Sequence, residues 1–126
     1  MRRLRITVGG VQAEAELNDS KTATALWEAL PISAAASIWG DEIYFGIPVH
    51  TGEEDARATV DLGDLGYWPP GNAFCIFFGP TPMSRTKDEI RPASPVNVLG
   101  RVSGDVSAFK RVRSGEVVTL ARVEQP

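Results

Sequence analysis

The first seventeen residues alternate between apolar and polar side chains. Apolar residues occupy positions 4, 6 and 8, and the alternation resumes from position 11 to position 17 after Gly9-Gly10. A period of two is typical of a strand with one buried face, and the glycine pair tolerates the positive φ of a two-residue hairpin turn. The turn fixes a register that sets three pairs opposite one another: Val8 with Val11, Arg5 with Glu14, and Arg3 with Glu16. The sequence therefore predicts a hairpin with one apolar face and one face of opposed charges.

A helical period replaces this alternation after residue 18. The apolar positions follow the spacing i, i+3, i+4 and i+7 and fall at Ala23, Leu26, Trp27 and Leu30. Asp19 or Ser20 can cap the N-terminus, because a short oxygen side chain satisfies free N–H groups of the first turn. Pro31 ends the pattern. We expect a helix over Ser20–Leu30, with the tryptophan in the core.

A shorter helical pattern occurs near the C-terminus. Asp105 is a candidate cap, Gly115 is a candidate stop, and the residues expected to point inward are Val106, Phe109 and Val112. The sequence predicts a second helix over Val106–Arg113.

Residues 34–47 predict a second hairpin, with Gly40-Asp41 as its turn. In that register the apolar pairs are Ile38 with Ile43, Ala36 with Phe45, and Ala34 with Ile47. The opposite face carries Trp39, Glu42, Ser37 and Tyr44.

The remaining pattern is also mainly that of strands. Residues 56–68 predict two short strands separated by Gly63-Asp64, and residues 72–79 show so little alternation that the strand should be buried on both faces. A long loop rich in proline and charge follows, and strands are expected at 96–102 and 117–123. About eight neighbouring strands and two helices favour a mainly β fold. We expect a single domain over residues 1–126, an eight-stranded antiparallel β-barrel with the two α-helices capping its open ends.

Composition adds expectations about location and partners. No stretch approaches the roughly 20 apolar residues of a transmembrane helix, and the N-terminus reads as a strand and not as a signal peptide. The net charge is −3, and the sequence contains no stripe of basic residues. Neither a nucleic acid nor a membrane is therefore an expected partner. A single cysteine fits a reducing compartment, and the expected location is cytoplasmic.

Few residues are suited to catalysis. His50 and Cys75 are the only histidine and cysteine, so the chain offers no zinc-ligand set and no serine–histidine–aspartate triad. Phosphate-binding glycine motifs are absent as well. We therefore assign no catalytic residue, no metal site and no cofactor. The acidic run 53–55 is interpreted as a solvated loop, and Cys75, among apolar neighbours, as a structural and unreactive thiol.

Several stretches resemble a known family. The segment "NVLGRVSGDVSAFKRV" is similar to the closing strand and helix of cyclophilins, and "NAFCIFFG" to their strand with paired phenylalanines. The longer blocks "WGDEIYFGIPV", "GDLGYWPPGNAFCIFFGPTPMS" and "PASPVNVLGRV" resemble small cyclophilin-like proteins of bacteria and archaea, a family without an assigned activity. The resemblance covers nearly the whole chain and implies an eight-stranded barrel capped by two helices.

One departure from true cyclophilins bears on activity. When "IYFGIP" is aligned on Pro48 with the catalytic F-H-R-[IV]-I-P strand, Phe45 stands at the arginine position and Tyr44 at the histidine position. In that family the arginine donates hydrogen bonds to the twisted X–Pro amide. Phenylalanine has no donor to lower the uncatalysed barrier of roughly 18–20 kcal/mol. Arg57 or Arg85 could substitute only from a loop, so prolyl isomerase activity is expected to be weak or absent.

A candidate ligand site involves five residues near the barrel rim. Pro69-Pro70 cannot donate to a β-ladder and precedes a Gly-Asn turn, so the residues just before it should lie at a strand end. If this rim meets the outer face of the second hairpin, it forms an aromatic pocket with one acid. The predicted lining residues are Trp39, Glu42, Tyr44, Tyr67 and Trp68. Since neighbours in a strand face opposite ways, only one of Tyr67 and Trp68 need face the pocket. Alternatively, the aromatic residues plug the barrel end.

Three functions follow from these interpretations. The first is a module that binds a peptide or small ligand in the rim pocket without chemistry. The second is a weak peptidyl-prolyl isomerase. The third is a structural or regulatory subunit that acts through an oligomer interface, and a homo-oligomer is possible in that case.

Overall fold

The N-terminal hairpin has the register that the sequence predicts. In the computed structural model, which describes residues 2–123, β1 (Arg3–Val8) and β2 (Val11–Leu17) pair antiparallel, with Val8 opposite Val11 and Arg5 opposite Glu14. Both arginines of the polar face turn to one acid: Arg5 lies 3.6 Å and Arg3 lies 3.3 Å from a Glu14 carboxylate oxygen. Such exposed pairs contribute at most about 1 kcal/mol, so the buried apolar face sets the register.

The first helix also forms where its pattern predicts. Helix α1 spans Lys21–Ala29, and the Ser20 hydroxyl caps it by accepting a hydrogen bond of 3.1 Å from Ala23 N. An acid from the predicted solvated loop adds a second cap, since the Glu54 carboxylate accepts from Lys21 N and Thr22 N. A hydrogen bond from the Thr22 hydroxyl, followed by these two backbone bonds, lowers the pKa of Glu54. The acidic loop therefore anchors the helix N-terminus as well as meeting solvent.

The second predicted helix is wrong in type. Residues Ser107–Arg111 form a 3-10 helix, η2, instead of an α-helix over 106–113. The three inward residues Val106, Phe109 and Val112 are buried as expected. They are spaced by three residues, and a helix with three residues per turn holds them on one face. An apolar spacing of three thus fits either helix type, and the short segment adopts the tighter one.

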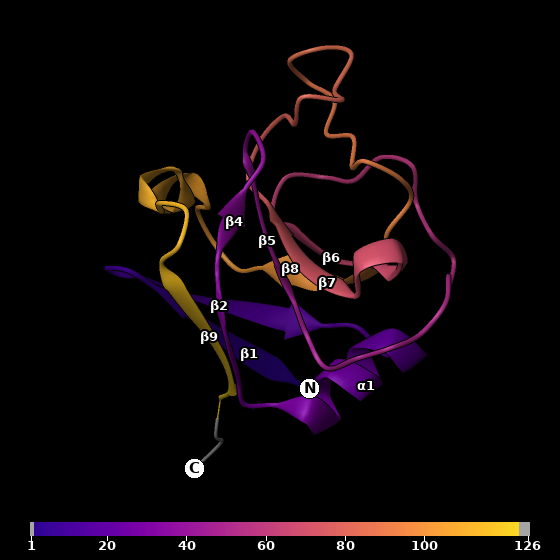
Figure 1. The fold of residues 1–126 in the computed structure, drawn as a ribbon, viewed down its shortest axis with the longest axis vertical. Coiled ribbons are helices and arrows are strands. Elements are labelled where there is room, and N and C mark those ends of the chain that lie inside the picture. Colours follow the sequence, from indigo (N-terminus) through magenta and orange to yellow (C-terminus); the bar gives the residue numbers. More distant parts are fainter. Residues whose placement is uncertain (1, 124–126) are drawn as a thin grey trace.

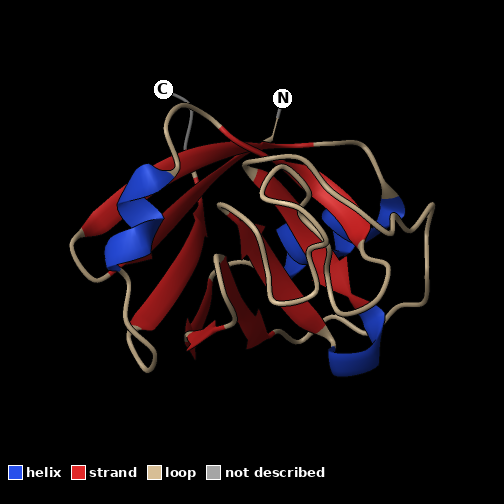
Figure 2. Cartoon of the chain, turned by 90° about the horizontal axis from the view of Figure 1, so that it is seen from above, coloured by secondary structure: helices blue, strands red, loops and turns tan. Residues whose placement is uncertain are grey.

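The strands form one antiparallel sheet of nine that curves into a nearly closed barrel (Figures 1 and 2). The remaining strands and the short 3-10 helix η1 have these bounds: β3 Ile32–Ala35, β4 Ser37–Ile38, β5 Glu42–Gly46, β6 Asp64–Trp68, η1 Pro69–Gly71, β7 Ala73–Phe77, β8 Asn97–Val102 and β9 Val117–Arg122. Their order in the sheet is β3-β9-β1-β2-β8-β6-β7-β5-β4. The predicted mainly β barrel is confirmed, with one α-helix in place of two.

The additional strand arises because the first strand of the predicted second hairpin is divided into β3 and β4. The pair Ile38–Ile43 forms as expected, but the hairpin ladder ends at the next pair, and Ala34 lies opposite Val118 of β9 instead of Ile47. Ala36 marks the change of partner, since its N–H donates to the Glu116 carbonyl at 2.8 Å. One segment therefore begins on β9 and ends on β5, and this switch brings the two sheet edges together.

Only one strand forms in residues 56–68, where the sequence predicted two. Strand β6 begins after a turn in which the Asp64 side chain accepts from Asp61 N at 2.9 Å. Upstream of it, Arg57 makes an isolated bridge to Val96, and Val60 makes another to Ile90. This stretch pairs locally with the long loop after β7 and does not join the barrel ladder.

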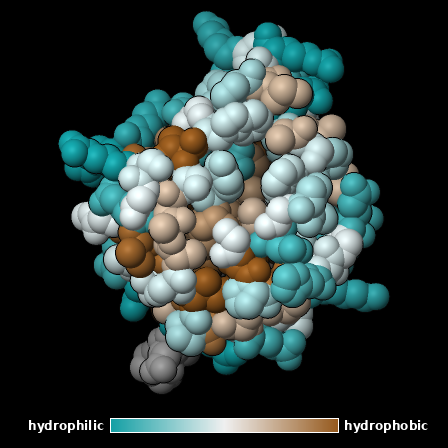
Figure 3. All heavy atoms as spheres, in the orientation of Figure 1, coloured by the Kyte–Doolittle hydropathy of each residue, from teal (hydrophilic) through white to brown (hydrophobic). Residues whose placement is uncertain are grey.

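Strand β7 is buried on both faces, as predicted. Phe74 and Ile76 belong to the cluster inside the barrel. Cys75 and Phe77 face outward into a second cluster, whose other buried members are Val60, Ile90 and Val96. The long loop of residues 79–96 thus covers the outside of the barrel with its base, while its hydrophilic tip projects at the top of the molecule (Figures 1 and 3).

None of the helices between residues 2 and 123 combines the length and apolar character that crossing a membrane would need.

The barrel depends on a close approach of β2 and β8. A Cβ built at Gly100 would overlap the carbonyl oxygen of Glu16, which is backbone and cannot move aside cheaply. We expect Gly100→Ala to lower the free energy of unfolding by about 2 kcal/mol or more, measured by urea denaturation. Gly46→Ala in β5 is the matched control, because its added methyl meets open space, and it should change stability by less than about 1 kcal/mol. Equal stabilities of the two variants would contradict this explanation.

Candidate functional site

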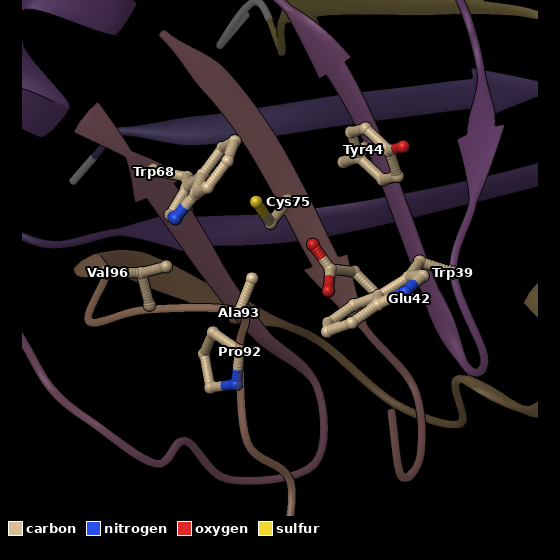
Figure 4. A pocket seen from close by; sticks show the side chains of 8 residues that line it. All are labelled: Trp39, Glu42, Tyr44, Trp68, Cys75, Pro92, Ala93 and Val96. Atoms are coloured by element: carbon tan, nitrogen blue, oxygen red, sulfur yellow. The ribbon is translucent and has the colours of Figure 1, made fainter. Parts of the chain in front are cut away.

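An aromatic pocket lies on the outer face of the barrel, beside the second apolar cluster. It has a volume of about 290 Å³ and is bounded by β5, β6, β7 and the end of the long loop (Figure 4). Its lining residues are Trp39, Glu42, Tyr44, Trp68, Cys75, Pro92, Ala93 and Val96. Four of the five residues singled out from the sequence therefore meet around one cavity.

The tight turn after β4 positions two of the four. Trp39 and Glu42 exchange backbone hydrogen bonds of 2.9 and 3.2 Å across Gly40-Asp41, so their side chains leave the hairpin on the same face. Tyr44 lies two residues further along β5 and joins that face by strand alternation. The pattern of the sequence was sufficient to place these three side chains together.

Trp68 closes the pocket from the end of β6. Its indole Nε1–H donates to the Ser94 hydroxyl at 2.6 Å, which ties the ring to the loop that forms the opposite wall. The ring also lies against η1, since a Cβ at Gly71 would come within 2.7 Å of Trp68 Cζ3. The indole is thus held in place from two sides before any ligand arrives.

Tyr67 does not line the pocket, unlike the other four residues predicted from the sequence. Its side chain is fully buried in the barrel core, and its hydroxyl lies 2.6 Å from Val49 O and 2.8 Å from Asn72 Oδ1. Adjacent residues of a strand point to opposite faces, so Trp68 turns outward and Tyr67 inward. The core needs this hydroxyl to be paired: its single proton can be donated to either oxygen, and the hydroxyl oxygen accepts from Thr51 N at 3.3 Å.

Sequence reasoning missed four lining residues. Cys75 lies opposite Tyr44 in the β5–β7 ladder, so a correct strand pairing would have placed it there. The loop residues Pro92, Ala93 and Val96 had no such signal, because they reach the site only through tertiary folding of the 79–96 loop.

Glu42 is the one charged side chain in the pocket lining. Only 6% of its surface is exposed, and its Oε1 atom has no hydrogen-bond partner among the described residues. Burial raises the pKa of this carboxyl to about 7, and the neighbouring Cys75 thiol lowers it by a smaller amount. Near neutral pH the site therefore holds a partly ionised carboxyl group whose Oε1 atom lacks a structural partner.

Cys75 forms part of the pocket floor beside this acid. Its thiol is 1% exposed, and burial, together with the nearby Glu42 carboxyl, raises the pKa of the thiol well above its ordinary value. A thiol that stays protonated is a poor nucleophile. The pair thus offers a buried acid and a neutral thiol.

No cation faces the pocket from the part of the chain that the structure describes. Phe45, at the position that corresponds to the cyclophilin arginine, points into the core and stacks on Phe74 with ring centroids 5.3 Å apart. Arg57 and Arg85, the two residues that might have substituted, are exposed and do not line the pocket. Within residues 2–123 no three potential ligand side chains gather closely enough to hold a metal ion. The arrangement can stack against a ligand and pair with its polar group.

The acid should make stability depend on pH. Glu42 binds its proton more tightly in the folded protein, with a pKa near 7 against an ordinary value of 4.5. Its stabilising contribution is therefore complete below pH 4.5 and is lost as the pH rises through 7. As the pH rises from 5 to 8, we expect the free energy of unfolding of the wild type to fall by about 2 to 3 kcal/mol relative to that of Glu42→Gln. Urea unfolding measures both values. The exposed Glu28→Gln is the control and should follow the wild type, and parallel profiles for all three proteins would refute the expectation.

The thiol should be inert in the folded state. Because Cys75 is buried and its pKa is raised, we expect a disulfide reagent at pH 7.5 to label it at least about a hundredfold more slowly in native than in denatured protein. The release of the coloured thiolate measures both rates. Labelling of the native protein at the denatured rate would show an accessible thiolate.

Comparisons with known proteins agree with this architecture. A family model described as cyclophilin-like matches residues 2–121. The solution structure of a hypothetical protein from Archaeoglobus fulgidus superposes with a TM-score of 0.83 at 44% sequence identity, covering 97% of this chain and 95% of that chain. No protein with a curated description is significantly similar. Barrel, sequence match and structural match lead to one conclusion: the chain belongs to the cyclophilin-like family, among small members that include an archaeal protein of unassigned function.

Proposed function

We propose that the protein is a binding module that takes an apolar or aromatic group of a small molecule or peptide into the outer pocket, without catalysing a reaction. The observation that carries the proposal is a preformed aromatic cavity containing a buried, unpartnered carboxyl oxygen on Glu42. Buried polar groups are almost always paired. An orphan on a side chain that lines a cavity is therefore explained most simply if a ligand completes it.

The walls suit recognition by stacking. Trp39, Tyr44 and Trp68 are each half-buried, so part of every ring remains available on the cavity side. Stacking on such rings contributes on the order of 1 kcal/mol for each contact. The volume is at the lower end of the range for small-ligand sites, which suits a single ring or one side chain of a peptide.

The same geometry argues against isomerase chemistry. Stabilising a twisted X–Pro amide needs a donor aimed at the amide, and the described residues place no arginine, lysine or histidine in the pocket lining. The only acid there can accept or donate a proton but carries no positive charge. Binding of a proline-containing group is compatible with the site, whereas acceleration of its isomerisation is not part of the proposal.

The test uses neutral probes and the three indole N–H signals of the protein. We expect indole and N-acetyl-proline amide to bind in about the millimolar range, near −4 kcal/mol, and to shift the signals of Trp39 and Trp68. Trp27 serves as an internal reference, because it lies on α1 under Arg122, whose guanidinium carbon is 4.8 Å from the ring centroid. The measurement is a ¹⁵N-edited NMR titration.

A pocket-filling variant completes the design. Ala93→Phe places a ring in the cavity from an exposed loop position and should weaken binding at least about tenfold, while the exposed Ala35→Phe of β3 should bind like the wild type. Silence of all probes at 10 mM, about the weakest affinity the method reaches, would refute the proposal. So would equal binding to both variants, or a protease-coupled proline-peptide assay showing isomerase turnover that Ala93→Phe abolishes.

A further inference from the structure

The lining of the outer pocket contains an acidic residue but no basic one. Glu42 is the sole charged residue of the lining, and the other polar groups there are the Tyr44 hydroxyl, the Cys75 thiol and two indole N–H groups, one of which already binds Ser94. Arg91, which precedes the lining residue Pro92 in the sequence, is paired with Glu89 at 2.8 Å and does not line the cavity. Among residues 2–123 the cavity therefore has an acid and aromatic faces but no counter-ion.

Such surroundings discriminate between ligands by charge. A carboxylate ligand would meet the Glu42 carboxyl in a poorly solvated space, where like charges repel strongly. A cation would supply the missing partner, and the faces of Trp39, Tyr44 and Trp68 would attract it further through their ring quadrupoles. Contacts of this kind are stronger when they are desolvated than at exposed sites, so the preference for a cation should be measurable even for small probes.

The free oxygen decides which cation fits best. Oε1 of Glu42 can accept a hydrogen bond and has no donor within the described structure. A primary ammonium group has three N–H donors at a compact centre. A quaternary ammonium group has the charge but no donor, and would leave Oε1 unsatisfied.

We propose that the pocket selects a primary ammonium group on an apolar stem, with Oε1 of Glu42 as its hydrogen-bonded counter-ion and the aromatic rings holding the stem. This inference rests on the proposed binding function and names the ligand chemistry of the same site. The ammonium can belong to a small amine or to a lysine side chain, since both present an NH₃⁺ group on a short methylene chain.

Binding should depend on pH through the same acid. The titratable groups that face Glu42 are Tyr44 on its own strand and Cys75 on β7, while Trp39 and the loop residues Pro92 and Ala93 bring none. Cys75 stays protonated because burial raises the pKa of its thiol, and alkyl ammonium groups remain charged below about pH 9. Glu42, whose pKa is raised to about 7, titrates between pH 6 and pH 8. Loss of its proton accompanies cation binding, so affinity for the amine should fall about tenfold from pH 8 to pH 6.

The experiment compares matched probes that share a benzyl stem. Benzylamine, benzyl alcohol, phenylacetate and benzyltrimethylammonium are titrated at pH 8 into the wild type and Glu42→Gln, with the indole N–H signals of Trp39 and Trp68 as the readout. We expect benzylamine to bind at least about tenfold more tightly than benzyl alcohol and the quaternary ion, and phenylacetate to bind weakest. In Glu42→Gln the advantage of the amine over benzyl alcohol should shrink to within about twofold.

Two further arms separate the possible outcomes. N-acetyl-lysine methylamide is compared with benzylamine, and tighter binding of one assigns the ammonium to a peptide or to a small amine. If benzyl alcohol and benzylamine bind equally, or if the affinity for the amine does not change between pH 8 and pH 6, the cation inference is overturned and the binding function stands. If the quaternary ion binds as well as the amine, the role of Oε1 is overturned. If no probe binds, the inference fails together with the proposed function.

Discussion

Burial of strand β7 on both of its faces is the constraint on which the rest of the structure depends. A strand with Phe74 and Ile76 on one side and Cys75 and Phe77 on the other has no polar face to offer to water. It therefore needs two covers. The barrel interior provides one, and the base of the long 79–96 loop, with Val60 beside it, provides the other. The outer pocket lies at the border of this second cover, where Pro92, Ala93 and Val96 approach β5 without filling the space over Glu42 and Cys75 (Figure 4).

Closure of the barrel sets the geometry on the other side of the pocket. The chain from Ile32 to Ile38 changes partner at Ala36: its first part pairs with β9 and its last part pairs with β5. Because this segment pairs with strands at both edges of the sheet, few backbone N–H and C=O groups are left unpaired. Closing a sheet into a barrel removes its free edges in this way. The same segment leads directly into the Gly40-Asp41 turn, so closure also fixes where Trp39 and Glu42 emerge. The scaffold of the site is thus a consequence of the ladder that completes the barrel.

The pocket differs from the core in that it contains a buried polar atom without a hydrogen-bond partner among residues 2–123. In the barrel core the buried hydroxyl of Tyr67 has partners within hydrogen-bonding distance. On the outer face Glu42 is almost as deeply buried but its Oε1 is left without a partner. An apolar residue there would serve stability better, because an unpaired buried carboxyl costs free energy. Membership of the cyclophilin-like family supplies the barrel; the acid among three aromatic rings, with Phe45 turned into the core, distinguishes the chemistry of this site from one built around an arginine.

The sequence by itself determined the features that depend on local periodicity and turns. Alternation and a Gly-Gly turn sufficed for the register of β1 with β2, the serine cap sufficed for the start of α1, and the Gly40-Asp41 turn placed Trp39, Glu42 and Tyr44 on one face. Only the tertiary structure decided matters that involve distant partners. Ala34 was free to pair with Ile47 or Val118, and the closure of the barrel chose the latter. Val106, Phe109 and Val112 fitted either helix type by spacing alone. The two aromatic residues at the end of β6 were equivalent in the sequence until the barrel gave the strand an inside, which took Tyr67, and an outside, which left Trp68 in the pocket. The far wall came from a proline-rich loop whose path has no periodic signal, since its fold is set by what it covers.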